Sequence, residues 1–436
     1  MANKTPAWFE EAAVYQINPR TFSPEGTIAA VKKELPALRE LGFKIMYLCP
    51  IFKADASEDR AFWSERQKAS LTENPKNPYR MNDYFEIDEE YGSMADLKDF
   101  VASCHANGMR VVLDLVYLHI GPNADILKVH PEFAAKNPDG TPKLTRWHFP
   151  YLNYECEGLR EYLWCNMAYY VGVIGADGFR CDVGDDVPLD FWSEGMRRIL
   201  AIKPDALMIN EGVKPGHLSV FHANYTFWWH NCVFDFMNGD MTAAELISRD
   251  EAERAQVPSG KRLLRDMDNH DTVTDWPYRI EGHFGSDAME LILAMNYTID
   301  GVPMVYCGNE LADTAHLSMF ANRFHMGGFE TTDRGASSDA VTKRKAVISA
   351  LNAMRASTFA VCRGRMRWLP ESGGAILAFE RELDGETVRF IGNFSSENAA
   401  LAFDCGEEVV LSNNTEIIGG RVTLSSYGYA ITKRKI

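Results

Sequence analysis

Gly178-Phe-Arg-Cys-Asp182 is the stretch that decides the fold, because it is a short strand-like run that ends in a carboxylate. Glu211 follows the apolar run 206–209 in the same way, and Asp271 follows the pair Leu263-Leu264. Short apolar runs bounded by turn signals are typical of buried parallel strands. Because the carboxyl ends of parallel strands lie on one face, we expect the three carboxylates to meet at one active-site mouth.

The same alternation of strand and helix extends over residues 1–357. A strand-like segment at 13–22 precedes apolar residues at helical spacing in 28–41, and the apolar run 45–52 follows. Ser93 and Asp96 form a capping-box pattern before the next helix, which leads to the apolar run 111–117. This rhythm favours a closed (β/α)8 barrel, or TIM barrel, although spacing alone leaves an open doubly wound sheet possible.

Two regions depart from the rhythm. Residues 119–160 are rich in Pro, Asn and Asp, which predicts a small loop domain inserted into the catalytic barrel after the third strand. Residues 358–436 contain short alternating runs separated by Asp-Gly, Asn-Asn and Gly-Gly turns. We therefore predict a C-terminal antiparallel β-sandwich domain over 358–436.

Composition narrows the class of protein. The 436 residues carry a formal net charge of −16, which argues against nucleic-acid binding because phosphate backbones require clustered cations. No apolar run reaches the length of a membrane span, and the first residues lack the apolar core of a signal peptide, so we expect no membrane contact and a cytoplasmic location. The nine cysteines show no paired C-x-x-C spacing, which argues against disulfide and zinc frameworks.

Six short motifs occur in order over nearly the whole chain. They are Asn77-Pro-Tyr-Arg-Met-Asn-Asp-Tyr84, Val111-Val-Leu-Asp-Leu-Val-Tyr-Leu-His119, Gly178 to Asp182, Glu211, Asn269-His-Asp271, and Gly301-Val-Pro-Met-Val-Tyr-Cys-Gly-Asn-Glu310. Each motif alone is weak, but their shared order and spacing are specific, and together they resemble the motifs of the α-amylase family of glycoside hydrolases.

The resemblance implies roles for residues within these motifs. It makes Asp182 the catalytic nucleophile and Glu211 the general acid/base, with Asp271 as the third catalytic carboxylate, gripping sugar hydroxyls. Arg180, on the same side of its strand as Asp182, would orient that carboxylate and keep its pKa low.

The remaining implied residues bind substrate, with Tyr79 stacking beneath the sugar and His119 and His270 donating or accepting hydrogen bonds. Taken alone, Asp182 would be a turn former, His119 a loop histidine and Tyr79 a half-buried ring. Only the shared pattern favours the catalytic interpretation.

No metal site or other cofactor is expected. Many members of the family hold calcium through an Asn just before the first-region His and through a carboxylate in the loop domain. Leu118 and Tyr151 stand at the matching positions here, and calcium requires six to eight oxygens. The Asp-rich loop of some relatives is also replaced, by residues 22–27.

The sequence thus predicts a retaining α-glycosidase that hydrolyses α-glucosidic bonds of short malto-oligosaccharides or related α-glucosides, its partner being a small-molecule oligosaccharide. Two alternatives remain. Transglycosylation or sugar isomerisation uses the same glycosyl-enzyme, and a non-catalytic sugar-binding homologue would be expected to lack Asp182 or Glu211, which are both present. No feature of the sequence indicates an oligomeric state.

Overall fold

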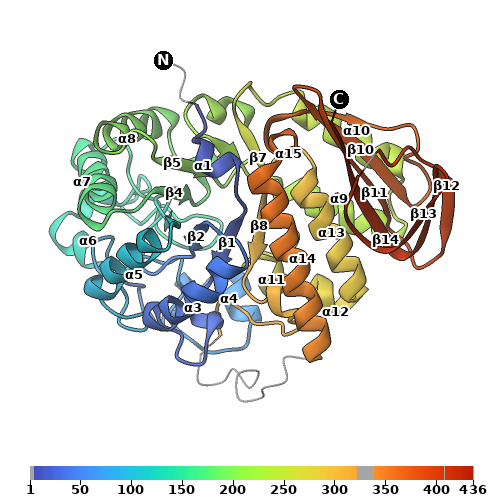
Figure 1. Cartoon of the computed structure of the whole chain (residues 1–436). Helices are drawn as coiled ribbons and strands as arrows, with labels where there is room; N and C mark the ends of the chain where they lie inside the picture. Colours follow the sequence, from blue (N-terminus) through green and yellow to red (C-terminus); the bar gives the residue numbers. More distant parts are fainter. Residues whose placement is uncertain (1–3, 322–336, 407, 436) are drawn as a thin grey trace.

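The computed structural model describes residues 4–321, 337–406 and 408–435. Within the first range, eight parallel strands close into a barrel in chain order, with β8 paired to β1 (Figure 1). The strands are β1 (Val14–Ile17), β2 (Ile45–Leu48), β3 (Arg110–Leu115), β4 (Gly178–Cys181), β5 (Leu207–Asn210), β6 (Ala223–Asn224), β7 (Arg262–Arg265) and β8 (Val302–Tyr306). The predicted (β/α)8 barrel is confirmed.

Helices form the outer layer around this barrel (Figure 1). The longer ones are α3 (Ile28–Glu40), α5 (Met94–Ala106), α7 (Glu157–Tyr169), α8 (Leu189–Ile202), α9 (Phe227–Asn238), α10 (Ala243–Arg254), α13 (Ser286–Thr298) and α14 (Ser338–Ser357). The predicted capping box is present at the start of α5, where the Ser93 and Asp96 side chains each accept the other residue's backbone N–H. Between β5 and β6 the described chain has only a 3₁₀ turn, Pro215–Ser219.

Two strand predictions need correction. The strand expected over 13–22 ends at Ile17, because Pro19 has no N–H for a sheet ladder and its fixed φ suits the first turn of helix α2 (Pro19–Phe22). The two-residue strand β6 was not predicted, since it is too short to show a periodic pattern.

Shorter helices lie in the connections. They are α1 (Ala7–Glu10), α4 (Glu65–Ala69), α6 (Asp125–Val129), α11 (Thr272–Asp275), α12 (Ile280–Phe284) and α15 (Phe359–Arg363). The segment 119–160 is mostly irregular and is held by isolated bridges such as His119 with Tyr151 and Leu144 with Pro150.

The C-terminal strands form an antiparallel sheet. In order along the chain they are β9 (Arg365–Trp368), β10 (Ile376–Leu383), β11 (Glu386–Asn393), β12 (Ala399–Ala402), β13 (Glu408–Ile418) and β14 (Arg421–Lys435). All six described strands connect into one sheet, because β14 pairs with β11, β12 and β13, and the predicted antiparallel β fold of this region is confirmed. The domain division at residue 358 stays a prediction.

The inside of the barrel is filled by a cluster separate from the core under the outer helices. Strand side chains alternate, so Val14, Ile45, Tyr47, Val112 and Leu207 point inward, while their chain neighbours pack outward. None of the nine cysteines forms a disulfide. Among the described helices, none is long and apolar enough to span a bilayer.

Candidate active site

The alternation of inward-facing residues delivers polar side chains to the carboxyl end of the barrel. On β3, Val112 fills the barrel interior and Asp114, two residues later, shares its side of the strand. On β4, Gly178 and Arg180 pair in register with these two residues. Asp182 and Glu211 continue the inward rows of β4 and β5 by one more step, so the strand pattern itself brings these carboxylates together.

Gly178 makes room for this arrangement. A Cβ at position 178 would lie 2.3 Å from the Leu207 carbonyl oxygen on the adjacent strand β5. Any other residue there would push β4 away from β5, and the two strands carry Asp182 and Glu211 at their ends. The glycine that opens the motif therefore sets the spacing of the site.

Arg180 lies at the centre of the predicted residues. Its Nη1 donates to Asp114 Oδ1 at 2.7 Å and to Asp182 Oδ1 at 2.9 Å. Its Nη2 lies 2.7 Å from Glu211 Oε1, as an ion pair whose angle is not that of a hydrogen bond. One fully buried guanidinium thus interacts with the carboxylates of Asp114, Asp182 and Glu211.

The sharing of Arg180 among three carboxylates affects the pKa values of Asp182 and Glu211, the predicted catalytic pair. Burial and the charge of Glu211 raise the pKa of Asp182 well above its ordinary value, and the attraction of Arg180 does not compensate. Burial also raises the pKa of Glu211, again against the pull of Arg180. The prediction that Arg180 keeps the pKa of Asp182 low is wrong, because Asp114 and Glu211 share its charge.

The backbone next to Asp182 holds the other oxygen of Glu211. The Val183 N–H donates to Glu211 Oε2 at 2.7 Å. Val183 has φ of 43°, in the left-handed region that β-branched residues rarely adopt. Such strain is retained where the surrounding structure imposes it, and here it aims the N–H at the predicted acid/base.

Asp271 is paired with a residue that the sequence analysis missed. Arg66, on α4, donates from Nη2 to Asp271 Oδ1 at 2.7 Å and from Nε to Asp275 Oδ1 at 2.7 Å. Although burial opposes it, electrostatic interaction with the His270 ring and with the Arg66 guanidinium holds the pKa of Asp271 below its ordinary value. Arg66 lies in an irregular connection between β2 and α5, where no periodic pattern could have identified it.

His119 has one ring nitrogen to offer a ligand. A carbonyl oxygen only accepts, so Nε2 carries the proton that is donated to the Tyr79 carbonyl at 2.8 Å. Nδ1 is then an acceptor, and it is buried without a hydrogen-bond partner among the described residues. Burial lowers the pKa of His119 to about 4, so this acceptor stays unprotonated at neutral pH.

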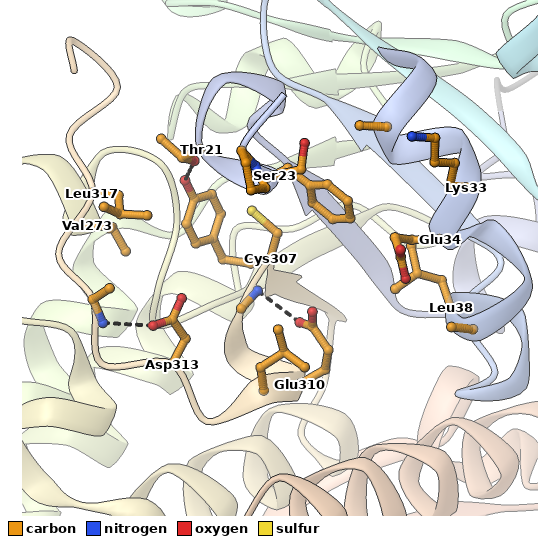
Figure 2. Close-up of a pocket in the computed structure, with 18 of the residues that line it drawn as sticks. Thr21, Ser23, Lys33, Glu34, Leu38, Val273, Cys307, Glu310, Asp313 and Leu317 are labelled. Carbon is orange, nitrogen blue, oxygen red and sulfur yellow. Dashed lines mark hydrogen bonds between the residues drawn. The ribbon is translucent and has the colours of Figure 1, made fainter. Parts of the chain in front are cut away.

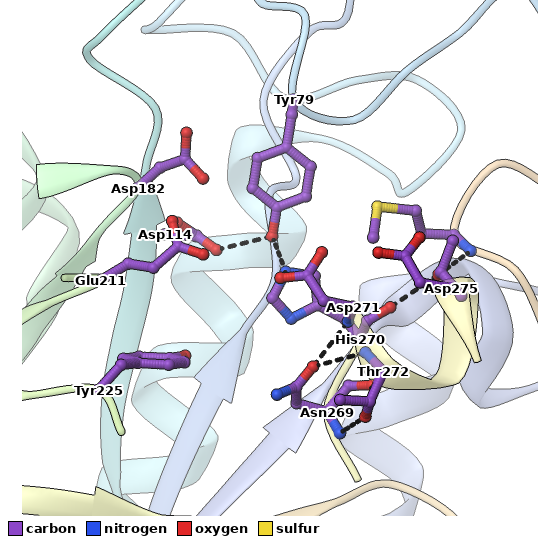
Figure 3. Close-up of polar contacts among 12 residues, drawn as sticks. Tyr79, Asp114, Asp182, Glu211, Tyr225, Asn269, His270, Asp271, Thr272 and Asp275 are labelled. Atoms are coloured by element: carbon purple, nitrogen blue, oxygen red, sulfur yellow. Dashed lines mark hydrogen bonds and ion pairs between the residues drawn. The ribbon is translucent and has the colours of Figure 1, made fainter. Parts of the chain in front are cut away.

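One cavity of about 430 Å³ gathers six of the seven predicted residues, and Arg180 lies behind Asp182 and Glu211. Figure 3 shows Asp114, Asp182 and Glu211 on one side of Tyr79, with His270 and Asp271 on the other. Trp147, Phe149, Phe227 and Phe320 supply apolar wall. The lining combines aromatic surface with a few convergent carboxylates, as expected of a site for a small polar ligand.

A second cavity, of about 310 Å³, lies between α3 and the turn after β8 (Figure 2). Two of its acidic groups are engaged locally: Glu310 accepts from Tyr15 and from the Gly308 N–H, and Asp313 accepts from the Ala315 N–H. None of the predicted site residues lines it.

No described group of three or more His, Cys, Asp or Glu side chains is arranged to hold a metal ion. Leu118 is buried, and Tyr151 pairs with His119 through the backbone. Asp185 instead accepts the backbone N–H groups of Val213 and Lys214, which ties the loop after β4 to the loop after β5.

Comparison with known proteins finds similarity to α-amylases and related enzymes. The model of the alpha amylase catalytic domain matches residues 6–138. A cyclomaltodextrinase from a Bacillus species is 29% identical over 358 residues, covering 70% of this chain and 60% of that protein.

The chain is thus similar to members of the α-amylase family. An intracellular maltogenic amylase of Bacillus subtilis is 24% identical over 357 residues, covering 71% of this chain and 56% of that protein. The chain therefore spans 56% to 60% of the length of these two α-amylase relatives. The crystal structure of an alpha-amylase from Lactobacillus plantarum has the same fold, with a TM-score of 0.81, 22% identity, and coverage of 98% of this chain and 99% of that one.

Proposed function

We propose that this protein is a retaining α-glycosidase that hydrolyses α-glucosidic bonds of short malto-oligosaccharides or related α-glucosides. The observation that carries the proposal is the placement of Asp182 and Glu211 in one cavity, both paired with Arg180. Retention requires two carboxyl groups close together, about 5 to 5.5 Å apart, one to attack and one to protonate.

In this proposal the reaction takes two displacements. Asp182 attacks the anomeric carbon while Glu211 gives its proton to the departing glycosidic oxygen, and the bond from Asp182 to the sugar replaces the bond to the leaving group. Water then attacks the same carbon, Glu211 accepts the proton of that water, and Asp182 leaves. The raised pKa of Glu211 suits its role as the acid, because Glu211 then holds its proton to a higher pH than an exposed carboxyl group does.

The remaining residues of the cavity have roles in holding the sugar. Asp271, kept ionised by Arg66, accepts hydrogen bonds from sugar hydroxyls through the oxygen that Arg66 leaves free. His119 Nδ1 accepts a hydrogen bond from a further sugar hydroxyl. Tyr79 offers an aromatic surface at the cavity wall.

Names of relatives support the substrate class and location. Matching relatives include cyclomaltodextrinases, a maltogenic alpha-amylase and a neopullulanase, which suggests α-glucans or their fragments for this chain. The intracellular maltogenic amylases among them support the proposed cytoplasmic location.

The test is a product screen by mass spectrometry with maltose, maltotriose, isomaltose, sucrose and trehalose. We expect shorter sugars from at least one α-glucoside. Products longer than the substrate would indicate transglycosylation, and a rearranged disaccharide would indicate an isomerase. Folded protein that converts none of these sugars, nor longer maltodextrins, would contradict the proposal.

A further inference from the structure

Gln16 is a fully buried polar residue that neither the sequence motifs nor the proposed reaction uses. It lies on β1, on the inward side shared with Val14. In the closed barrel β8 separates β1 from β7, yet the Gln16 side chain reaches His270, which follows β7. A buried amide with both ends on one histidine is an ordered contact rather than packing.

The two hydrogen bonds between these residues fix the orientation of the amide. Gln16 Oε1 accepts the backbone N–H of His270 at 3.2 Å, and a backbone N–H can only donate. The other end of the amide is therefore the NH₂ group, and it lies 2.9 Å from His270 Nδ1. Since an amide NH₂ only donates, Nδ1 accepts.

A neutral imidazole whose Nδ1 accepts carries its proton on Nε2. That nitrogen lies 2.6 Å from the Tyr79 hydroxyl, so His270 donates to Tyr79. The Tyr79 hydroxyl then directs its own proton to Asp114 Oδ2, at 3.2 Å (Figure 3). Asp114 in turn accepts from Arg180, which pairs with both catalytic carboxylates.

We propose that Gln16 is a positioning residue of the active site, which holds His270 in the tautomer protonated on Nε2 and thereby fixes the hydroxyl and ring of Tyr79. The Tyr79 and His270 rings are stacked at 5.5 Å with an interplanar angle of 16°. The sequence motifs predict that His270 binds the sugar directly. In this structure both of its ring nitrogens have protein partners, Gln16 at Nδ1 and Tyr79 at Nε2.

The environment of His270 supports a neutral ring. Burial lowers the pKa of His270 to about 4. A protonated ring would place an N–H on Nδ1 against the NH₂ group of Gln16, which adds a geometric reason for neutrality. Asp271 Oδ2 lies 3.5 Å from Nε2, on the side where the proton is already present.

The test uses protein with ¹⁵N-labelled histidine, whose ring nitrogen shifts distinguish the two tautomers by NMR. The His270 signal is the one missing from His270→Phe. At about pH 9, above the ordinary pKa of Glu, we expect wild-type His270 to be protonated on Nε2 only. In Gln16→Glu at the same pH, the carboxylate only accepts, so Nδ1 should take up the proton. Tyr79→Phe is the matched control, because it removes the other partner and should leave the tautomer unchanged.

Wild-type His270 protonated on Nδ1, or a tautomer that follows Tyr79→Phe and not Gln16→Glu, would overturn the proposal. Should Gln16→Glu fail to fold, Gln16→Met serves instead, since it offers neither donor nor acceptor. Both tautomers should then be populated, and a spectrum unchanged from wild type would overturn the proposal equally.

The kinetic consequence rests on the proposed function, whereas the tautomer does not. In Gln16→Met we expect kcat/KM for the best α-glucoside to fall by up to about 100-fold, since small displacements of a substrate-positioning group have effects of this size. Unchanged kcat/KM in a variant whose tautomer has shifted would remove the positioning role. A wild-type protein without glycosidase activity would contradict the proposed function while the NMR result still decides the tautomer.

Discussion

Arg180 and Asp182, two residues apart at the end of β4, form a buried ion pair of 2.9 Å, and the same guanidinium also serves Asp114 and Glu211. Because three carboxylates surround the single Arg180 cation, the buried site would carry excess negative charge if all three were ionised. Such a site holds a proton more tightly than isolated carboxyl groups do. Asp182 and Glu211, the predicted catalytic pair, therefore hold a proton to a higher pH than exposed carboxyl groups do.

Asp182→Asn should abolish turnover without loss of stability. The raised pKa of Asp182 means that folding favours its protonated form, so its contribution to stability falls as pH rises through the folded-state pKa. The neutral amide mimics the favoured form, and Arg180 retains Asp114 and Glu211. We expect a melting temperature at neutral pH equal to or above that of wild type, measured by calorimetry. Substantial residual activity on a good substrate would exclude Asp182 as the nucleophile.

Glu211→Gln should lose activity selectively. The rate of hydrolysis of a glycosyl fluoride, whose fluoride leaves without a proton, should fall far less than the rate with a natural glycoside. With a natural glycoside, general acid catalysis contributes a factor of about 10² to 10⁴ to the rate. Removing the charge of Glu211 also lowers the pKa of Asp182, so the acidic limb of the pH profile with the fluoride should move to lower pH. Equal losses on both substrates would remove Glu211 from the acid role.

Asp177 should be important for stability, not for chemistry. It is buried at the amino end of β4 and accepts hydrogen bonds from Lys203, Arg110, His105 and the Val111 N–H, which outweigh burial and hold its pKa below the ordinary value. A lowered pKa stabilises the fold above the unfolded-state pKa, and this stabilisation is lost as pH falls through the folded-state pKa.

We therefore expect Asp177→Asn to lower the free energy of unfolding by about 3 kcal/mol at pH 7, and by less in acid. Urea unfolding at several pH values measures this difference. A loss that does not shrink as pH falls would contradict the ion-pair explanation.

Calcium should not be required. Leu118 offers no side-chain oxygen, and Asp185 is engaged by the loop after β5. Since a tightly bound ion raises the melting temperature, its removal would lower it. We predict that excess EDTA changes neither activity nor melting temperature. A drop of several degrees that calcium restores would reveal a site built from other ligands.

The barrel and the meeting of the candidate carboxylates in one cavity could be predicted from the sequence, because each depends on local pattern. Buried parallel strands read as apolar runs, and residues such as Asp182 and Glu211 stand directly after such runs. The two-residue strand β6 has no such pattern, and Pro19 ended β1 earlier than its apolar neighbours suggested.

The supporting residues of the site could not be predicted in this way. Gln16 looks like any polar residue in a strand, and Arg66 lies in an irregular connection, so their partners His270 and Asp271 are visible only in three dimensions. The pKa of Asp182 was mispredicted for a related reason. The sequence places Arg180 beside Asp182 but does not show how many carboxylates share the cation.

The stereochemistry of the first product tests the central claim most directly. Proton NMR recorded within the first moments of hydrolysis of an α-glucoside distinguishes the anomers before mutarotation mixes them. The account predicts the α anomer, because attack by Asp182 followed by attack of water inverts the anomeric carbon twice. An initial β anomer would show a single displacement by water between the two carboxyl groups, and would contradict Asp182 as a nucleophile.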